Sequence, residues 1–423
     1  MKIAMVHPSL WGRGGAERQL LRLAIELQNF GHEVEIFTDA VNEQCYPELL
    51  RKLNVNVVPH PLWRLHRGLG WQATSSMIRR EPAERRSVSR VQRLMKKLVL
   101  RQYYVNELPI MLNLGRNIPK GFDVINNHNF PSEWAAFITK QHVKVPIVWM
   151  CNGPPSWFLS KKSRGLKGRL YWPLFELFDK TAVDYIDTIA VISHMSADDV
   201  RKAYDKPSQI VRSGVDVDFF HNASGESFRK EHGLEKSFVL LQVGNIGFVR
   251  GNIDAVQILG RLSRRHDNVK LVFDGYGSQD QIKALTSLAD KLGVKDKLLF
   301  VHSESDRELA EVYAGCDAFI YPSKLTWSLA VTEAMAAAKP VIVPKECGVS
   351  EIIQSGVNGI VVDNAGPEEV AKKIEALMDD PMLRKKLGEN AYGYVKNNLS
   401  WETYAKKMEN VFEQTIINFK KNQ

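Results

Sequence analysis

The sequence predicts an α/β protein made of two Rossmann-like domains, each built on a parallel β-sheet. Three observations lead to this prediction. The chain has 423 residues, which is more than one hydrophobic core usually supports. Short apolar runs alternate with helical patterns in both halves, which is the order of a parallel sheet. Several of these runs end in Gly or Ser, and parallel sheets bind ligands at that carboxyl edge.

Residues 1–205 form the first predicted domain. An apolar strand over residues 2–7 leads through a glycine-rich turn into an amphipathic helix that stops at Gly31. The turn contains Gly12, Gly14 and Gly15 but lacks the third glycine of a GxGxxG fingerprint, so a free-standing dinucleotide site is not expected. Further strands are expected over residues 32–39, 54–58, 122–130, 145–155 and 187–193, and a helix over residues 166–185.

We expect residues 206–236 to connect the two domains. They contain the strand-like stretch QIVRSGVD, a turn around residues 214–216, and polar, poorly periodic sequence up to residue 236. The second domain spans residues 237–396. Its strands are expected within residues 237–247, 269–277, 297–303, 316–323, 341–343 and 352–363. Its helices are expected over residues 252–263, 279–292, 368–378 and 381–396, with another starting at residue 306. Residues 397–423 contain the last helix, expected over residues 401–419.

The composition is that of an ordinary globular protein. The N-terminal apolar run is too short for a signal peptide, and no run reaches the roughly 18 apolar residues of a transmembrane helix. The 4 cysteines are scattered without CxxC spacing, which favours neither a disulfide framework nor a zinc site. We therefore expect a cytoplasmic protein, at most peripheral on the inner face of the membrane.

The positive charge is concentrated in a helical insertion expected over residues 62–120. Between residues 64 and 101, eleven basic side chains face only Glu81 and Glu84, which accounts for the whole formal net charge of +9. From Arg79 to Arg101, apolar residues recur at helical spacing between the cations. Such a helix can lie on anionic lipid, or it can be a solvated helix packed on its own domain. Nucleic acid is not expected, because no nucleic-acid module is recognisable.

The most informative stretch covers residues 321–344 and reads YPSKLTWSLAVTEAMAAAKPVIVP. Its loop leads into a short helix that carries Glu333 and then into an apolar strand, which is one αβ unit of a parallel sheet. The start of the helix would direct free N–H groups and a positive partial charge at a ligand, usually a phosphate. The two oxygens of a carboxylate such as Glu333 can accept both hydroxyls of a vicinal diol.

This stretch resembles the donor-sugar motif of family 4 glycosyltransferases. These are retaining enzymes of the GT-B fold, in which two Rossmann-like domains face each other across a cleft, and they use nucleotide-diphosphate sugars. Glu333 and the Ala-Met-Ala after it match the family's second glutamate, whereas Leu325 occupies the position of the first. The resemblance implies transfer of a hexose to a glycan or lipid-linked acceptor at the cytoplasmic membrane face. It implies no metal, and no cofactor besides the nucleotide-sugar co-substrate.

The resemblance also implies roles for individual residues. As catalytic residues, His128 would contact the transferred sugar, Arg250 would neutralise the donor diphosphate, and Glu333 would bind the ribose hydroxyls. Asn245 occupies the position of a second phosphate-binding cation. The last helix would cross back to the first domain. The other donor-binding residues would be Gly14 and Gly15 in the glycine loop, Thr326, Trp327, Ser328 and Leu329 beside the phosphate and hexose, and Gly277 and Ser303 near the nucleobase.

Several of these residues also have a plain structural interpretation. His128 can be a polar strand end, and Trp327 can be a core anchor as readily as a platform for a sugar ring. Because Asn245 carries no charge, the diphosphate would be under-neutralised. Three explanations are open. Arg13 or Lys345 supplies the missing positive charge, or a divalent ion supplies it, or the protein binds the donor without catalysing its transfer.

Other functions therefore remain open at this stage. With Leu325 and Asn245 in place of charged residues, the main rival is a non-catalytic sugar-nucleotide-binding protein or partner subunit. A nucleotide-sugar epimerase of the same architecture is a third possibility. Asp216 and Asp218 imitate a metal-binding Asp-X-Asp, but they follow Ser-Gly-Val in a turn between the domains, so no metal site is expected there. The sequence does not indicate the nucleotide, hexose, acceptor, linkage or oligomeric state.

Overall fold

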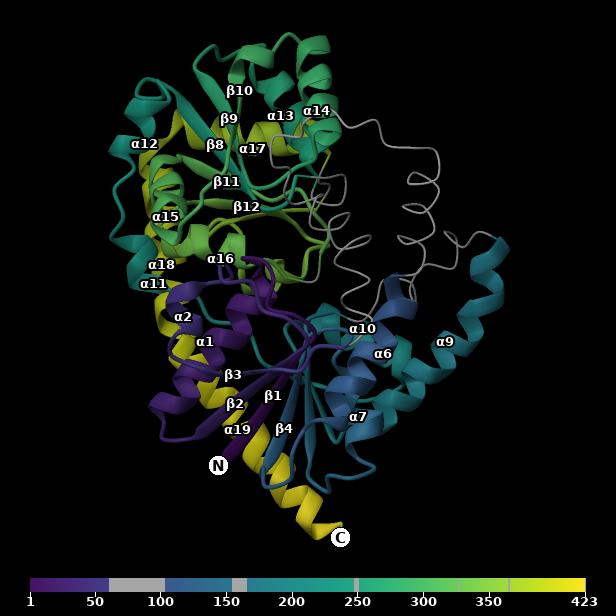
Figure 1. Cartoon of the computed structure of the whole chain (residues 1–423). Helices are drawn as coiled ribbons and strands as arrows, with labels where there is room; N and C mark the ends of the chain where they lie inside the picture. The colour runs from purple at the N-terminus through teal and green to yellow at the C-terminus, as the bar shows by residue number, and fades with distance from the viewer. Residues whose placement is uncertain (61–102, 154–165, 247–250, 326, 364–365, 423) are drawn as a thin grey trace. The chain divides into compact units, whose positions relative to one another are not determined.

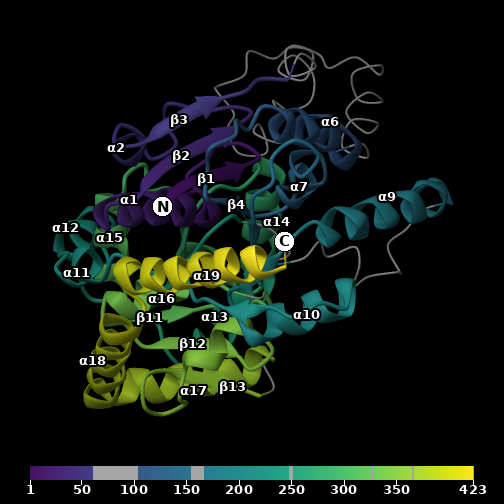
Figure 2. The ribbon, with the colours of Figure 1, turned by 90° about the horizontal axis from the view of Figure 1, so that it is seen from below.

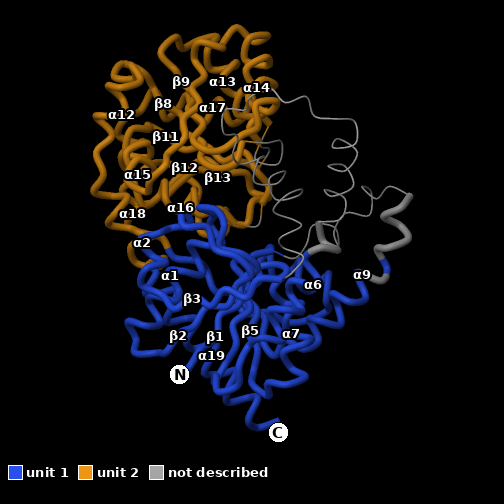
Figure 3. Tube along the Cα trace, viewed as in Figure 1, with its two compact units in different colours: residues 1–76, 81–214, 401–423 blue, residues 77–80, 215–400 orange. Residues whose placement is uncertain are grey.

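The computed structural model describes the chain except for residues 61–102, 154–165, 247–250, 326, 364–365 and 423 (Figure 1). The chain divides into two compact units (Figure 3). One contains residues 1–76, 81–214 and 401–423, and the other contains residues 77–80 and 215–400. Each unit has its own parallel β-sheet packed with helices, which confirms the predicted α/β class. The basic stretch from Arg79 to Arg101 lies outside the described residues.

The first unit is built on a seven-stranded sheet with the strand order β3-β2-β1-β4-β5-β6-β7. The order reverses between β1 and β4, and open α/β sheets bind ligands at such a switch point. Every residue of β4 and β5 is buried, as expected for central strands that are covered on both faces. The strands are β1 (Lys2–His7), β2 (Glu33–Thr38), β3 (Asn54–Val57), β4 (Val124–His128), β5 (Ile147–Cys151), β6 (Thr188–Val191) and β7 (Gln209–Ile210).

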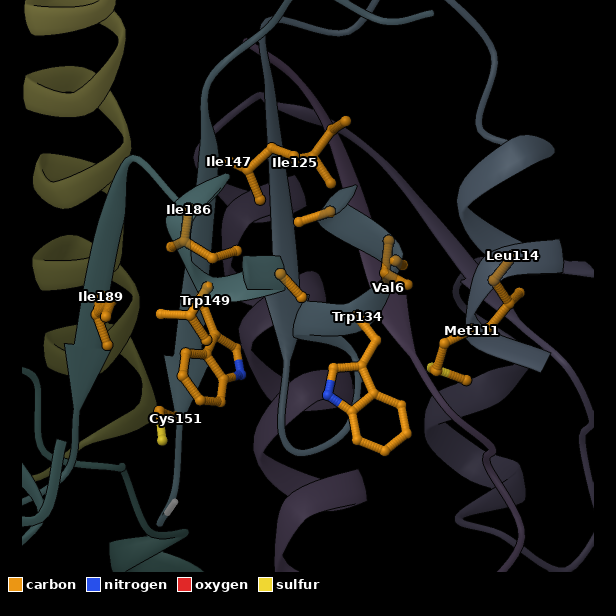
Figure 4. Close-up of a cluster of buried hydrophobic side chains, with 14 of the residues drawn as sticks. Val6, Met111, Leu114, Ile125, Trp134, Ile147, Trp149, Cys151, Ile186 and Ile189 are labelled. Atoms are coloured by element: carbon orange, nitrogen blue, oxygen red, sulfur yellow. The ribbon is translucent and has the colours of Figure 1, made fainter. Parts of the chain in front are cut away.

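Helices cover this sheet and contribute aromatic side chains to its core. Trp134 from α7 and Trp149 from β5 are fully buried in the main apolar cluster of the unit (Figure 4). Helix α19 packs beside α1 (Figure 2), and Nε2 of His32 lies 2.6 Å from a carboxylate oxygen of Glu409 on α19. The helices are α1 (Gly15–Asn29), α2 (Pro47–Leu50), α6 (Tyr103–Arg116), α7 (Glu133–Thr139), α9 (Leu166–Asp184), α10 (His194–Tyr204) and α19 (Trp401–Lys421).

The second unit has a six-stranded parallel sheet with the order β10-β9-β8-β11-β12-β13, which reverses between β8 and β11. Its strands are β8 (Phe238–Val243), β9 (Val269–Asp274), β10 (Leu298–Val301), β11 (Ala318–Ile320), β12 (Val341–Pro344) and β13 (Ile360–Val362). Its helices are α11 (Val217–His221), α12 (Glu226–Glu231), α13 (Asn252–Leu262), α14 (Gln279–Lys291), α15 (Asp306–Gly315), α16 (Leu329–Ala336), α17 (Pro367–Asp379) and α18 (Pro381–Asn398), with 3-10 turns η3 (Lys295–Lys297) and η4 (Gly348–Ile352).

The chain passes from the first unit to the second between Gly214 and Val215. A Cβ on Gly214 would lie 2.7 Å from the Cα of Trp401, so no larger residue fits beside the start of α19. Strand β7 lies in the stretch expected to be strand-like and joins the first sheet, whereas the short helices α11 and α12 follow in the part for which the sequence pattern predicted no regular structure. None of the described helices combines the length and the apolar character that crossing a bilayer requires.

Two glycines on α18 provide a matched test of the packing that supports α16. A Cβ on Gly388 would lie 2.0 Å from the carbonyl oxygen of Ala338, just beyond α16, whereas a Cβ on Gly393 would meet nothing within 4 Å. We expect Gly388→Ala to lower the free energy of unfolding by about 1–3 kcal/mol, because overpacking must push the backbones apart. Gly393→Ala should raise it by up to about 1 kcal/mol, because alanine favours the helix. Urea unfolding measures both, and a stabilising Gly388→Ala would contradict the close contact.

Candidate functional site

Two neighbouring strands of the second sheet are each followed by a glycine, and the backbones of these two glycines are in close contact. Gly244 follows β8 with a φ of +129°, and Gly275 follows β9 with a φ of +151°. A Cβ on Gly275 would lie 2.2 Å from the carbonyl oxygen of Gly244, and the N–H of Gly244 donates to the carbonyl of Asp274 at 2.9 Å. The N–H of Ile246 donates to the carbonyl of Tyr276 at 2.6 Å. Main-chain hydrogen bonds therefore join the two loops, and bare backbone allows a ligand to come close.

The loop after β10 is tied to the same edge of the sheet by a buried carboxylate. Asp274, the last residue of β9, accepts hydrogen bonds from the backbone N–H of Ser303 at 3.0 Å and from its hydroxyl. Burial raises the pKa of Asp274, although these two bonds favour its charged form. The predicted nucleobase residue Ser303 is thus at the carboxyl edge, but its hydroxyl donates to Asp274. Gly277 also lies there, and a Cβ on it would meet the side chain of Ile246 at 2.8 Å.

Pro322 brings the loop after β11 against the start of α13. Gly251 precedes α13 with a φ of +71°, and a Cβ on it would lie 2.0 Å from the carbonyl oxygen of Pro322. Sequence reasoning assigned no role to this glycine, although a glycine directly before a helical pattern is a usable signal. Asn245 is exposed on the loop after β8. Arg250, the residue before Gly251, lies outside the described residues, as does Thr326.

Glu333 is held in the second turn of α16 by a tyrosine that sequence reasoning missed. The residue is only 6 % exposed. The hydroxyl of Tyr313, from α15, lies 2.9 Å from Oε2 of Glu333 and 3.2 Å from the carbonyl oxygen of Ala330. A buried carboxylate needs hydrogen-bond donors, and a donation from Tyr313 fixes the direction in which Glu333 points. No sequence signal identifies this pair, since its members are twenty positions apart on different helices.

The residues just before α16 are more buried than a ligand platform would be. Trp327 is 8 % exposed, and its indole N–H is buried without a hydrogen-bond partner. Ser328 is the extended residue before α16 and is buried, and Leu329 is the first residue of the helix. The carbonyl of Leu325 accepts from the N–H of Gly348 at 3.0 Å, which ties this loop to the turn after β12.

In the first unit, the glycine loop is fastened by the segment that leads into α2. The Tyr46 hydroxyl donates to the carbonyl of Gly14 at 3.2 Å, and the Cys45 thiol donates to the carbonyl of Gly12 at 3.0 Å. Gly14 is the residue before α1, and the exposed Gly15 is its first residue. A Cβ on Gly14 would lie 2.3 Å from Oε2 of Glu17, so the glycine makes room for this carboxyl group.

His128 ends β4 at the switch point of the first sheet and is fully buried. Its Nε2 lies 3.0 Å from Oε1 of Gln19, and its Nδ1 lies 3.4 Å from Oδ1 of Asn126. Burial, with a smaller contribution from the neighbouring His7, holds the pKa of His128 well below its usual value. The imidazole is therefore neutral at pH 7, and both of its nitrogens already face groups of the first unit. Gly14, Gly15 and His128 share the carboxyl edge of the first sheet.

The two side chains proposed to compensate for the missing charge at Asn245, Arg13 and Lys345, already have partners. Arg13 lies 3.8 Å from Glu48 and also stacks over the ring of Tyr46, and Lys345 pairs with Asp363 at 3.0 Å. Across the described part of the chain, no three His, Cys, Asp or Glu side chains converge in a way that could hold a metal ion. At the carboxyl edge of the second sheet, the described residues include two buried carboxylates: Asp274, which accepts from Ser303, and Glu333, which Tyr313 orients.

Glu17 gives the glycine loop a testable pH dependence. Burial raises its pKa from 4.5 to about 7, so the folded chain binds more protons than the unfolded chain between these values. Stability from this group is present at low pH and is lost as the pH rises through that window. We expect the unfolding free energy of the wild type, minus that of Glu17→Gln, to fall between about pH 4.5 and 7 and to level off above. A difference that rises across this window in urea titrations would contradict the burial of the carboxyl group.

Comparisons with known proteins agree with this architecture. An uncharacterized glycosyltransferase of Methanocaldococcus jannaschii is 26% identical over 305 residues, which cover 69% of this chain and 75% of that protein. The D-inositol 3-phosphate glycosyltransferase of Corynebacterium glutamicum is 22% identical over 446 residues, covering 99% of this chain and 98% of the relative. Among solved structures, Anabaena HepE in complex with UDP and glucose superposes with a TM-score of 0.70 at 16% identity, over 98% of this chain and 99% of that one.

The family comparison assigns both halves of the chain. Residues 13–219 match the family described as Glycosyltransferase Family 4, and residues 224–394 match the family described as Glycosyl transferases group 1. The two matches meet near the division between the two units, at Gly214. The chain therefore belongs to the group 1 glycosyltransferases with a family 4 amino-terminal half, the glycosyltransferases of the GT-B fold.

Proposed function

We propose that this chain is a retaining hexosyltransferase that uses a nucleotide-diphosphate sugar and a glycan or lipid-linked acceptor. The general activity, glycosyl transfer, follows from membership of the family. The observation that supports the donor assignment is the buried Glu333 on α16, the helix that follows β11. Its carboxylate is oriented by Tyr313, which lies on α15. HepE, which has the same fold, was crystallised with UDP and glucose, and this supports a nucleotide sugar as the donor.

The proposed donor site uses the carboxyl edge of the second sheet. Glu333 accepts the ribose hydroxyls, and the peptide N–H groups at the start of α16, from Ser328 and Leu329, face the diphosphate. The loops at Gly244 and Gly275 bring bare backbone close to the nucleotide. The remaining donor contacts are assigned from the sequence alone. Arg250 would bind the diphosphate with Asn245 beside it, and Thr326 and Trp327 would lie beside the phosphate and hexose. Gly277 and Ser303 would lie near the base.

The proposed reaction retains the anomeric configuration and needs no dedicated protein base. The acceptor hydroxyl oxygen bonds to the anomeric carbon on the face from which the diphosphate departs. The bond from that carbon to the phosphate oxygen breaks, and the acceptor proton passes to the departing phosphate. Positioning and electrostatics then supply the rate. Arg250 and the helix N–H groups would stabilise the leaving charge, while His128 with Gly14 and Gly15 would position the hexose and acceptor through the first unit's backbone.

A binding screen tests the assignment of Glu333. Nucleotide sugars of UDP, GDP and ADP are added to the purified chain, and one series should raise the melting temperature. For that ligand, Glu333→Gln should increase the dissociation constant at least about tenfold, because charge-assisted hydrogen bonds contribute about 1.5–3 kcal/mol. Glu389→Gln on α18, whose carboxylate pairs with Lys385 in solvent, is the matched control and should bind as the wild type does. Equal affinity in all three proteins would remove Glu333 from the donor site.

A non-catalytic sugar-nucleotide-binding protein or partner subunit is the second candidate. Two observations favour it: Leu325 offers an aliphatic side chain where family members have a glutamate, and Asn245 offers an amide where they have an arginine. A protein of this kind would keep the donor site and lose turnover. An epimerase, the third candidate, would convert the nucleotide sugar without any acceptor.

A transfer assay separates these functions. The chain is incubated with radiolabelled nucleotide sugars and a membrane lipid extract, and we expect label to move into the lipid fraction. Donor binding with neither transfer nor hydrolysis would establish the non-catalytic candidate, and an isomerised sugar without acceptor would establish the epimerase.

We place the acceptor at the cytoplasmic membrane face because of the cationic stretch from Arg79 to Arg101. Transfer should then be faster to acceptors in anionic vesicles than in neutral ones, and equal rates would contradict that placement.

A further inference from the structure

Below the glycine loop, four polar side chains form a buried network at the switch point of the first sheet. His7 ends β1, Asn126 and His128 lie on β4, and Gln19 lies on α1. All four are at most 3 % exposed. The two imidazole rings have centroids 6.4 Å apart. Because these side chains are shielded from bulk solvent, each N–H of the network needs an acceptor nearby, among them or in the backbone.

Asn126 fixes the proton on His128. Its amide nitrogen donates to the carbonyl oxygen of Val148 at 3.2 Å, so its oxygen is the atom that faces Nδ1 of His128 at 3.4 Å. An amide oxygen is only an acceptor, and Nδ1 must therefore carry a hydrogen to bond with it. A neutral imidazole has a single N–H, which leaves a lone pair on Nε2 of His128.

The other side of the ring then requires a donor from Gln19. With the oxygen of Gln19 3.0 Å from Nε2, two acceptors would face each other, and the amide nitrogen of Gln19 would be buried without a partner. The two ends of an amide have the same shape, and the hydrogen-bond network decides between them. Turning the amide by half a rotation lets its nitrogen donate to Nε2. It leaves a carbonyl oxygen without a partner, which proteins tolerate better than an orphaned N–H group.

We infer that Gln19 is a positioning residue whose side-chain amide donates to Nε2 of His128 and holds that imidazole as the Nδ1–H tautomer. The ring then has no N–H to offer to a sugar hydroxyl. Two acceptors of the network are then without a hydrogen-bond donor. One is the remaining oxygen of Gln19, and the other is Nε2 of His7, whose Nδ1 lies 2.9 Å from the carbonyl oxygen of Ser9. The loss of a donor to the sugar rests on the proposed function, whereas the tautomer does not.

Nitrogen NMR of the full chain labelled with ¹⁵N-histidine tests the tautomer directly. The chain has 11 histidines, and the signals of His128 are those missing in His128→Asn. If that variant does not fold, they are the signals missing in His128→Gln. We expect Nδ1 of His128 to be protonated and Nε2 to resonate far downfield as an unprotonated ring nitrogen. The reverse pattern, with Nε2 protonated, would overturn the inference.

A pair of methionine variants tests the role of Gln19. Gln19→Met keeps the length of the side chain and removes its donor, so the Nε2 signal of His128 should move further downfield while Nδ1 stays protonated. Gln28→Met, nine residues further along α1 and therefore on its opposite face, is the matched control and should leave both signals in place. An unchanged Nε2 signal in Gln19→Met would show that Gln19 does not donate. Neither measurement needs a donor or acceptor substrate, so a failure of the proposed function would leave this result intact.

Discussion

The close approach of bare backbone at the carboxyl edge of the second sheet is the constraint on which the rest of that unit depends. Gly244 and Gly275 let two neighbouring loops touch, and Gly251 lets the start of α13 rest on Pro322. At Gly275 and Gly251 a Cβ would overlap the neighbouring backbone, so only glycine fits at these two positions. The N–H groups of Gly244, Ile246 and Gly275 donate to backbone carbonyls, so main-chain hydrogen bonds hold these loops in place.

In the first unit, the loop at the carboxyl edge of the sheet is held by side-chain hydrogen bonds and lies near a network of buried polar side chains. Its glycine loop is fastened by Tyr46 and Cys45, and the buried histidines and amides lie within hydrogen-bond distance of one another. Such a network specifies one arrangement, because a missing partner at a buried site costs more than a hydrogen bond gains. The result is a neutral His128 with a fixed ring. In the second unit, by contrast, a tyrosine orients a buried carboxylate at Glu333.

The strands could be predicted because buried parallel strands read as continuous apolar runs, as in β5 and β8. The helix α7 was missed because its seven residues make only two turns and give no clear period, and α10 was missed as well. Glu333 was found from the pattern around it. The partners of His128 and Glu333 could not be found, because Gln19 lies 109 positions from His128 and only the folded sheet brings them together. The roles of Arg250 and Thr326 remain predictions.

Backbone hydrogen exchange with and without a saturating nucleotide-diphosphate sugar tests the central claim, that the carboxyl edge of the second sheet holds the donor, most directly. The account predicts slower exchange in the loops after β8 and β9, near residues 244–246 and 275–277, and at the start of α16, near residues 329–333. Peptide groups that bind a ligand are protected from exchange, while the opposite edge of the same sheet should be unchanged. Protection confined to that opposite edge, or none at these three segments despite saturation, would contradict the account.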